Sequence, residues 1–300
     1  MSRRSNSSAC HNRPSDFYQG NTGLGKETVL QLAKHSPKEI FLAARTPSKA
    51  EAAIADIQTA VPNSNITFLE MDLTSFASIK KAADQFTARS SRLDILINNA
   101  GVMALPYSKT KEGYEIQFGT NHMGHSLLTK LLLPTLLRTA EESGSDVRVV
   151  NVSSMGHQMA PGPGIIYDQD ALEKFSTWRR YGQSKLADLL TARSLQQHYP
   201  QLTATSVHPG VIATDLYNSG MSNPIMKWTW KFMSLFLMDV PHGARTQLWA
   251  ATGPREKVRE SYYFVPYGKK SGGSFWHAQK TELAEGLWEW TEKELERQGY

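Results

Sequence analysis

Tyr181 and Lys185, in the segment YGQSKLADLL, have the residue types and the spacing that proton transfer requires. Residues four apart share one face of a helix. Holding a free tyrosine, which titrates near ~10, as phenolate at neutral pH requires roughly 4 kcal/mol. A lysine ammonium about 4 Å away supplies roughly that amount at an effective dielectric of ~20. Such a pair can serve as a base in alcohol oxidation and as an acid in carbonyl reduction. Taken alone, it could equally be an ordinary pair on a helix face.

Other polar residues stand where they could assist this pair. Ser153 and Ser154 end the apolar run VVNVSS, and Asn121 lies inside a long helical pattern. A serine hydroxyl can polarise a reacting oxygen, and an amide within a helix can order a water for proton exchange. The alternatives are a turn serine and a hydrogen-bonded core asparagine. The joint occurrence of these residues favours a catalytic set.

A glycine-rich segment, GNTGLGKETVLQLAK, precedes a helical pattern. Gly20, Gly23 and Gly25, with Asn21 and Leu24 between them, would let backbone amides and a helix N-terminus hold a pyrophosphate. A glycine-rich surface turn is the alternative. The segment predicts one end of a dinucleotide site.

The ends of the following strands supply further cofactor candidates. Arg45 stands where sites that prefer NAD commonly place an acid, and it could meet a 2′-phosphate, which favours NADP(H). A solvated arginine at a strand end is the alternative. Ligands of such sheets bind at the carboxyl ends of strands, where the sequence places Asp72, Leu73, Asn98, Ala100 and Gly101.

Short apolar runs alternate with helical patterns from residue 20 onward, which predicts an α/β fold: a doubly wound parallel sheet (Rossmann fold) with helices on both faces. The predicted strands are 38–44, 66–71, 93–99, 147–153, 202–208 and 261–266, and the predicted helices are 26–36, 48–60, 76–86, 115–137 and 185–199. We expect one catalytic domain over 20–300, preceded by an atypical segment over 1–19. The loop-rich stretch 155–180 interrupts the alternation.

Composition and charge exclude several classes of protein. The chain of 300 residues is 40% hydrophobic and 20% charged, as expected of a globular protein. Of its net charge of +5, residues 1–26 carry +3, because Arg3, Arg4, Arg13 and Lys26 face only Asp16. The remaining +2 is no basis for binding nucleic acid. The single cysteine and the lack of metal-ligand spacing or an apolar leader favour a metal-free cytoplasmic protein.

Residues 224–238, PIMKWTWKFMSLFLM, carry their strongly polar side chains on one narrow helical stripe. The apolar remainder could cover a pocket for a small lipophilic alcohol or ketone, or could simply pack in the core. Peripheral membrane contact is a lesser alternative, because the segment is too short to span a bilayer.

Taken in order, GNTGLG, NNAG, Asn121, Ser154, YxxxK and HPG resemble the classical short-chain dehydrogenase/reductase family. The spacing between Ser154 and Tyr181 and the ending LWEWTEKEL most resemble its retinol-dehydrogenase-like branch, including fungal members, some of secondary metabolism. The likeness covers about residues 20–295. It implies a variable substrate lobe around 215–240 and a homodimer or homotetramer.

The resemblance also implies a role for each matched residue. Tyr181 would be the catalytic acid/base, and Lys185 would hold the nicotinamide ribose and favour the tyrosine's phenolate. Ser154 would bind the substrate oxygen, and Asn121 would keep a relay water. Asn98 and Gly101 would support the cofactor. The nicotinamide amide would lie beside the segment that contains Pro209, Gly210, Val211 and Thr214.

The sequence departs from the family at its first strand and first glycine. Tyr18 and Gln19 stand where the family has threonine and glycine, and the preceding SSACHNRPSD has no strand pattern. We therefore expect the first strand to be degenerate or missing, with ladder hydrogen bonds lost and cofactor affinity impaired. A wrongly assigned start, a splice or truncation variant, or a poor substitute strand over 8–18 would each explain this. The alternative function is a non-catalytic binding or regulatory protein on the same fold.

Overall fold

A computed structural model of the chain describes residues 15–212, 238–273 and 276–300. Its described residues form one eight-stranded sheet in the order β3-β2-β1-β4-β5-β6-β7-β8, in which only the pair β7 and β8 is antiparallel. The sequence order reverses between β1 and β4. In an open parallel sheet, this reversal opens a crevice at the carboxyl ends of the strands. The doubly wound fold predicted from the sequence is confirmed.

Strands β2 to β7 occupy the runs in which strands were expected, whereas β1 and β8 lie outside those runs. Their bounds are β1 Ser15–Gln19, β2 Glu39–Ala44, β3 Ile66–Glu70, β4 Ile95–Asn98, β5 Arg148–Val152, β6 Thr203–Val207, β7 Tyr263–Val265 and β8 Lys269–Lys270. Strands β2 and β4 are nearly continuous apolar runs because both of their faces are covered by helices.

The first strand, which we expected to be degenerate or missing, is present. Residues Ser15–Gln19 pair in parallel with Glu39–Ala43 on one side, and Asp16, Phe17 and Tyr18 pair with Ile95–Ile97 on the other. The expected loss of ladder hydrogen bonds on both sides is therefore wrong. A substitute strand is formed, but over 15–19 rather than 8–18; residues 1–14 lie outside the described part of the chain. The proposed domain boundary at residue 19 thus follows a central strand of the sheet.

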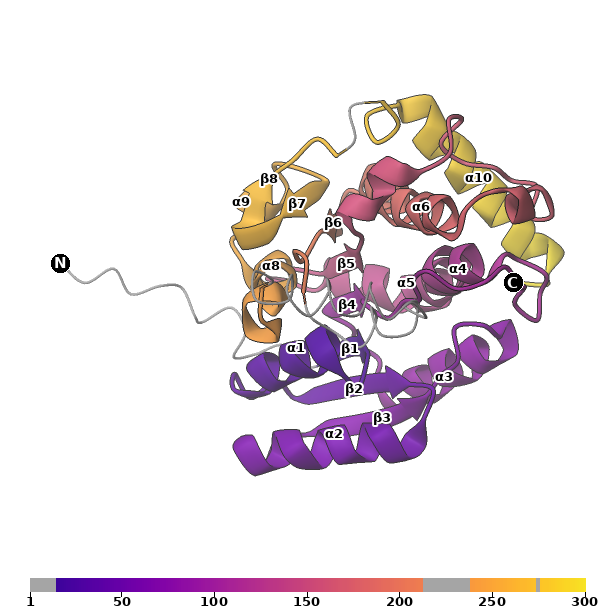
Figure 1. The fold of residues 1–300 in the computed structure, drawn as a ribbon. Coiled ribbons are helices and arrows are strands. Elements are labelled where there is room, and N and C mark those ends of the chain that lie inside the picture. The colour runs from indigo at the N-terminus through magenta and orange to yellow at the C-terminus, as the bar shows by residue number, and fades with distance from the viewer. Residues whose placement is uncertain (1–14, 213–237, 274–275) are drawn as a thin grey trace.

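Helices cover both faces of the sheet (Figure 1). One face carries helices α3 Phe76–Arg89, α5 Gly124–Glu141, α6 Thr177–His198 and α10 Thr281–Arg297. The other carries α1 Gly23–Ala33, α2 Pro47–Ala60 and α8 Val240–Thr252, with the short α9 Arg255–Val258 beside them. Short elements complete the described chain: α4 Ile116–Phe118, the π-helix η2 Gly119–Met123, and the 3-10 turns η3 Met155–Met159, η4 Ala171–Lys174 and η7 Pro266–Gly268.

Two successive residues of β1 join opposite halves of the core. Phe17 packs edge-to-face on Phe86 of α3, with ring centroids 5.6 Å apart, and Phe41 of β2 meets the same ring at 4.7 Å. Tyr18 belongs to the cluster beneath α1, α2 and α8. Alternation of side chains across a strand explains this division. The strand that lacked a recognisable pattern is therefore anchored on both faces by its two aromatic residues.

The helices agree with the predicted ones except at four places. The stretch expected as one helix over 115–137 contains a π-helical turn, η2, which includes Asn121. Helix α6 begins at Thr177, eight residues before the expected start, and so includes Tyr181. Helices α8 and α10 were not predicted. Of the predicted substrate lobe around 215–240, all residues before 238 lie outside the described part of the chain.

Candidate active site

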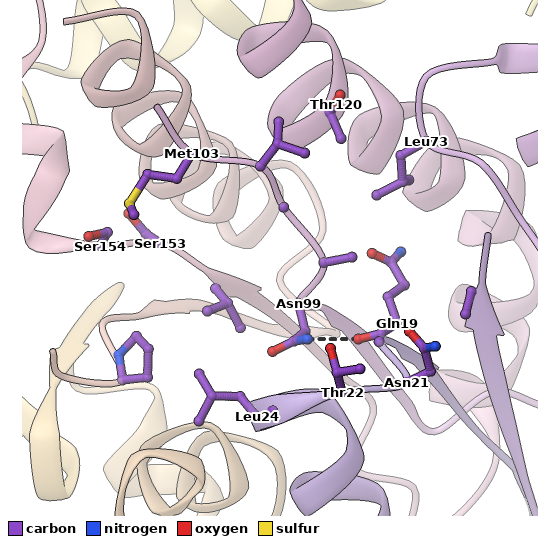
Figure 2. A pocket seen from close by; sticks show the side chains of 18 of the residues that line it. Gln19, Asn21, Thr22, Leu24, Leu73, Asn99, Met103, Thr120, Ser153 and Ser154 are labelled. Atoms are coloured by element: carbon purple, nitrogen blue, oxygen red, sulfur yellow. Dashed lines mark hydrogen bonds between the residues drawn. The ribbon is translucent and has the colours of Figure 1, made fainter. Parts of the chain in front are cut away.

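A pocket of about 610 Å³ lies along the carboxyl ends of the central strands, at the reversal of strand order. It runs from the glycine-rich turn after β1 to the chain that follows β5 and β6. Figure 2 shows Asn21, Thr22 and Leu24 on one side of it, and Met103, Ser153 and Ser154 on the other. The volume is in the range of small-molecule and cofactor sites.

The turn between β1 and α1 forms a cradle of backbone. Gly20 and Gly23 adopt φ of 118° and 51°, a region that favours glycine. A Cβ atom at Gly25 would lie 2.7 Å from the Gly20 carbonyl oxygen and 2.9 Å from that of Gln19. Asn99 braces the turn by donating from Nδ2 to the Gln19 carbonyl at 2.7 Å (Figure 2). Because α1 begins at Gly23, its free amides face the pocket, and the residues present fit a pyrophosphate.

Gln19, the residue expected to obstruct the turn, is accommodated within the protein. Its backbone continues β1, and the positive φ falls one residue later, at Gly20. Its buried amide donates to Asn98 Oδ1 at 3.2 Å and also contacts His125 Nε2. The side chain therefore has hydrogen-bond partners inside the protein, and the strain expected from positive φ at Gln19 is absent.

Arg45 and Asp72 line the pocket at the ends of β2 and β3. Arg45 is exposed and directly follows β2, which is the position expected to meet a ribose or its 2′-phosphate. The Asp72 carboxylate instead accepts from the amide and hydroxyl of Thr74 at 2.9 and 2.8 Å. Asp72 thus shapes the turn after β3, and Arg45 is the cation at this end of the pocket.

Tyr181 and Ser154 meet at the other end of the pocket. Ser154 follows β5 and caps η3, where its Oγ accepts from the Gly156 amide at 3.0 Å. A Cβ at Gly156 would lie 2.6 Å from Tyr181 Cε1, so the lack of a side chain lets the tyrosine ring pack against η3. Tyr181 is 5% exposed. The ring is therefore buried against η3, and Tyr181 lines the pocket.

Lys185 lies one helical turn after Tyr181 and lines the same pocket. Its Nζ donates to the Val152 carbonyl at 2.9 Å and to Asp188 Oδ2 at 2.9 Å. Ser153 fixes the adjacent backbone by donating from Oγ to the Lys185 carbonyl at 2.6 Å. Ser153 thus has a structural role, next in the chain to Ser154.

Asn121 and Asn98 lie behind the pocket and do not line it. Asn121 accepts from the Val102 amide at 2.8 Å and donates to Ser184 Oγ at 2.9 Å, and its backbone carbonyl lies 2.6 Å from His125 Nδ1. Asn98 donates to Asn151 Oδ1 at 2.9 Å and to Thr129. Asn121 thus holds the loop after β4 in place, whereas Asn98 joins β4 to β5 and α5. Asn99 is the neighbour that lines the pocket at the cofactor end.

The structure brings most of the predicted site residues together. The pocket is lined by Gly20, Asn21, Gly23, Leu24, Arg45, Asp72, Leu73, Ala100, Gly101, Ser154, Tyr181, Lys185, Pro209 and Gly210. Gly25 and Val211 adjoin this lining without belonging to it, and Thr214 lies outside the described residues. The lining residues that the sequence reasoning did not predict include Thr22, Thr74, Asn99, Met103 and Val240. Except for Val240, these follow or adjoin strand ends, which is the signal that could have found them.

Comparisons with known proteins agree with this geometry. The family described as short chain dehydrogenase matches residues 19–224. A short-chain dehydrogenase/reductase of Aspergillus calidoustus, drtF, is 40% identical and covers 93% of this chain and 92% of its own. Retinol dehydrogenase 12 of Mus musculus is 36% identical, and the match covers 89% of this chain and 81% of the mouse protein. The NADPH-bound carbonyl reductase from chicken fatty liver superposes with a TM-score of 0.64 at 25% identity, and the match covers 87% of this chain and 99% of the reductase.

The chain belongs to the short-chain dehydrogenase/reductase family, in its retinol-dehydrogenase-like branch. It is therefore an oxidoreductase of a family that uses a nicotinamide cofactor. Among the described residues, no helix combines the length and the apolar character needed to cross a membrane.

Proposed function

We propose that this chain interconverts an alcohol and a carbonyl on a small lipophilic substrate with NADP(H), and that Tyr181 is the acid/base. The observation that carries the proposal is that one pocket joins the glycine-rich cradle, Arg45 and the set Ser154, Tyr181 and Lys185. The cofactor, when bound, supplies or accepts the hydride. The protein must then position the substrate oxygen and move its proton.

Each residue has a proposed task in the reduction of a carbonyl. Ser154 donates a hydrogen bond to the substrate oxygen, and Tyr181 passes its hydroxyl proton to the same oxygen. Lys185 holds the nicotinamide ribose, and its ammonium stabilises the phenolate left on Tyr181. Asn121 holds the loop after β4, beside the proposed path of a relay water. In alcohol oxidation the same proton moves in the opposite direction.

Arg45 is proposed to select NADP(H) over NAD(H) by pairing with the 2′-phosphate. Replacing Arg45 by Ala should weaken NADPH binding about 10- to 100-fold, the range of a charge-assisted hydrogen bond, and leave NADH binding nearly unchanged. Fluorescence titration of both cofactors measures this. Lys49→Ala, which removes an exposed cation one turn into α2, is the matched control. Equal weakening of both cofactors in Arg45→Ala would contradict the assignment.

The same titration decides whether cofactor affinity is impaired. The formed β1 and the hydrogen-bonded Gln19 support an intact cradle, so we expect the parent protein to bind NADPH with a micromolar Kd. Failure to bind near 1 mM would instead support the non-catalytic alternative. That alternative was motivated by a lost first strand, and the strand is formed. We also propose a role in secondary metabolism. A homodimer or homotetramer is the oligomer we propose, which gel filtration would test.

A further inference from the structure

The carboxylate of Asp188 forms an ion pair with Lys185 inside the protein. Lys185 Nζ lies 2.9 Å from Asp188 Oδ2, and the two side chains are only 6% and 4% exposed. Residues three apart on a helix lie on one face, so α6 carries Tyr181, Lys185 and Asp188 along one side. The acid therefore stands on the far side of the lysine from the tyrosine along the helix.

This pair places a negative charge where the proposed chemistry depends on a positive one. Burial raises the pKa of Asp188 to about 6, against the attraction of Lys185. Burial alone would lower the pKa of Lys185, but attraction from Asp188 and Tyr181 outweighs it and raises that pKa. Both members are consequently charged at neutral pH. Removing one partner of such a buried pair leaves the other charge uncompensated.

The surroundings of the pair are polar but carry little other charge. A cavity of about 10 Å³, close to the size of one water, borders Asp188 and is lined by polar residues: Asn98, His122, His125, Ser126, Thr129, Asn151 and Thr191. Burial lowers the pKa of His122 and of His125 to about 3, which keeps both neutral. Beyond Tyr181 lie the titratable groups of η3, β7 and the chain after β6, namely His157, Tyr263 and His208.

We propose that Asp188 is a positioning residue, which anchors the Lys185 ammonium against β5 and offsets part of the positive charge that acts on Tyr181. The Val152 carbonyl and Asp188 take two of the three ammonium hydrogens, which leaves one for the ribose and the tyrosine. Asp188 thereby sets the pH range in which the tyrosine exchanges its proton. This inference rests on the proposed acid/base role of Tyr181.

Two substitutions of Asp188 separate the effect of its negative charge from its effect on the position of the Lys185 ammonium. Asp188→Asn keeps a hydrogen-bond acceptor but removes the charge, so the midpoint of the pH profile for alcohol oxidation should move about one pH unit toward acid, with KM for NADP nearly unchanged. Asp188→Ala should shift the midpoint similarly and also raise that KM about 3- to 10-fold, because the ammonium loses an anchor. An Asp188→Asn midpoint equal to that of the parent would overturn the inference.

A remote buried acid provides the control. Asp94 is 1% exposed and binds Arg92 at 2.7 and 3.0 Å, just before β4 and at the end of the sheet opposite the pocket. Asp94→Asn should lower stability and keep the parent's pH midpoint. If it moved the midpoint as far as Asp188→Asn does, the shift would be a general effect of a destabilised protein, and the inference would fail.

A spectroscopic measurement tests the pair without turnover. With 13C-labelled lysine, the Lys185 side-chain resonance, assigned by its absence in Lys185→Arg, should titrate at lower pH in Asp188→Asn than in the parent. Identical titrations would overturn the inference. If the parent has no turnover, or Tyr181→Phe retains it, the proposed function fails while this titration still reports on the pair.

Discussion

Replacement of Tyr181 by Phe is expected to lower turnover about 10²- to 10⁴-fold, the range of a positioned general acid or base. The substitution removes one hydroxyl and keeps the ring that packs on Gly156 of η3. Cofactor binding should change little, because the cradle and Arg45 follow β1 and β2, whereas Tyr181 lies on α6. The loss should therefore appear in kcat rather than in the Kd for NADPH. Steady-state oxidation of NADPH with a panel of lipophilic ketones measures the first, and fluorescence titration the second.

The matched control is Tyr263→Phe. Tyr263 is 1% exposed, and its hydroxyl has no hydrogen-bond partner among the described residues. Removing it should change turnover little, because no polar partner is left behind. A Tyr181→Phe variant that kept turnover within about threefold of the parent would contradict the acid/base assignment. A parent that binds NADPH but turns over no substrate of the panel would favour the non-catalytic alternative.

The sheet could be predicted because its strands are apolar runs separated by helical patterns. The runs at 66–71 and 147–153 contain β3 and β5 within one or two residues at each end. A parallel strand covered on both faces reads as a continuous apolar segment, which is a strong signal. Helix α8 was missed because Gly243 and Pro241 weaken its pattern, although Asp239 caps it by accepting from the His242 amide at 2.8 Å.

The first strand was misjudged because its sequence carries little local signal. SDFYQ holds two aromatic residues between polar neighbours, and no window of β-propensity around it stands out. Its conformation is set by the two strands that flank it, since, within the described part of the chain, this segment pairs with β2 along one edge and with β4 along the other. Gln19 was misjudged for the same reason: its partners Asn98 and His125 lie 79 and 106 residues away.

The site shows a similar limit at the level of single residues. The end of β4 was correctly identified as a ligand-facing edge, but Asn99 rather than Asn98 lines the pocket. Successive side chains point to opposite faces, so an error of one residue exchanges a cofactor contact for a core contact. The sequence places Asp188 three residues after Lys185, but this spacing alone could not show that the two side chains form a buried ion pair.

Acidification to pH 5 is expected to destabilise the fold by several kcal/mol, because buried histidines, foremost His122, His125 and His208, are held in neutral form. Burial lowers the pKa of His122 and His125 to about 3 and that of His208 to about 4. Each is below the unfolded value of ~6.5, so the unfolded chain binds more protons between these values, and stability falls as pH falls through this window. At pH 5 this proton binding lowers the free energy of unfolding by ~2 kcal/mol for each histidine and by ~6 kcal/mol for all three.

Asp188 opposes this effect but does not reverse it. Its folded pKa of about 6 lies above the unfolded value of 3.8, so acidification toward pH 5 favours the folded state at this site, by ~1 kcal/mol. For these four groups together the net loss is ~5 kcal/mol, which is comparable with the whole stability of many domains, ~5–15 kcal/mol. Urea unfolding followed by circular dichroism at pH 8, 7, 6 and 5 measures it.

A histidine variant identifies the source of the loss. His122→Asn removes one of the buried rings, so its free energy of unfolding should fall less between pH 7 and pH 5 than that of the parent, by ~2 kcal/mol, whatever its stability at pH 7. His35→Asn, at an exposed position after α1, should retain the parent's pH dependence. Carboxylates held in ion pairs would destabilise the fold only at lower pH, because their pKa values in the unfolded chain are ~4. A parent protein that loses stability only below pH 4 would therefore assign acid unfolding to carboxylates and exclude the histidines as its cause.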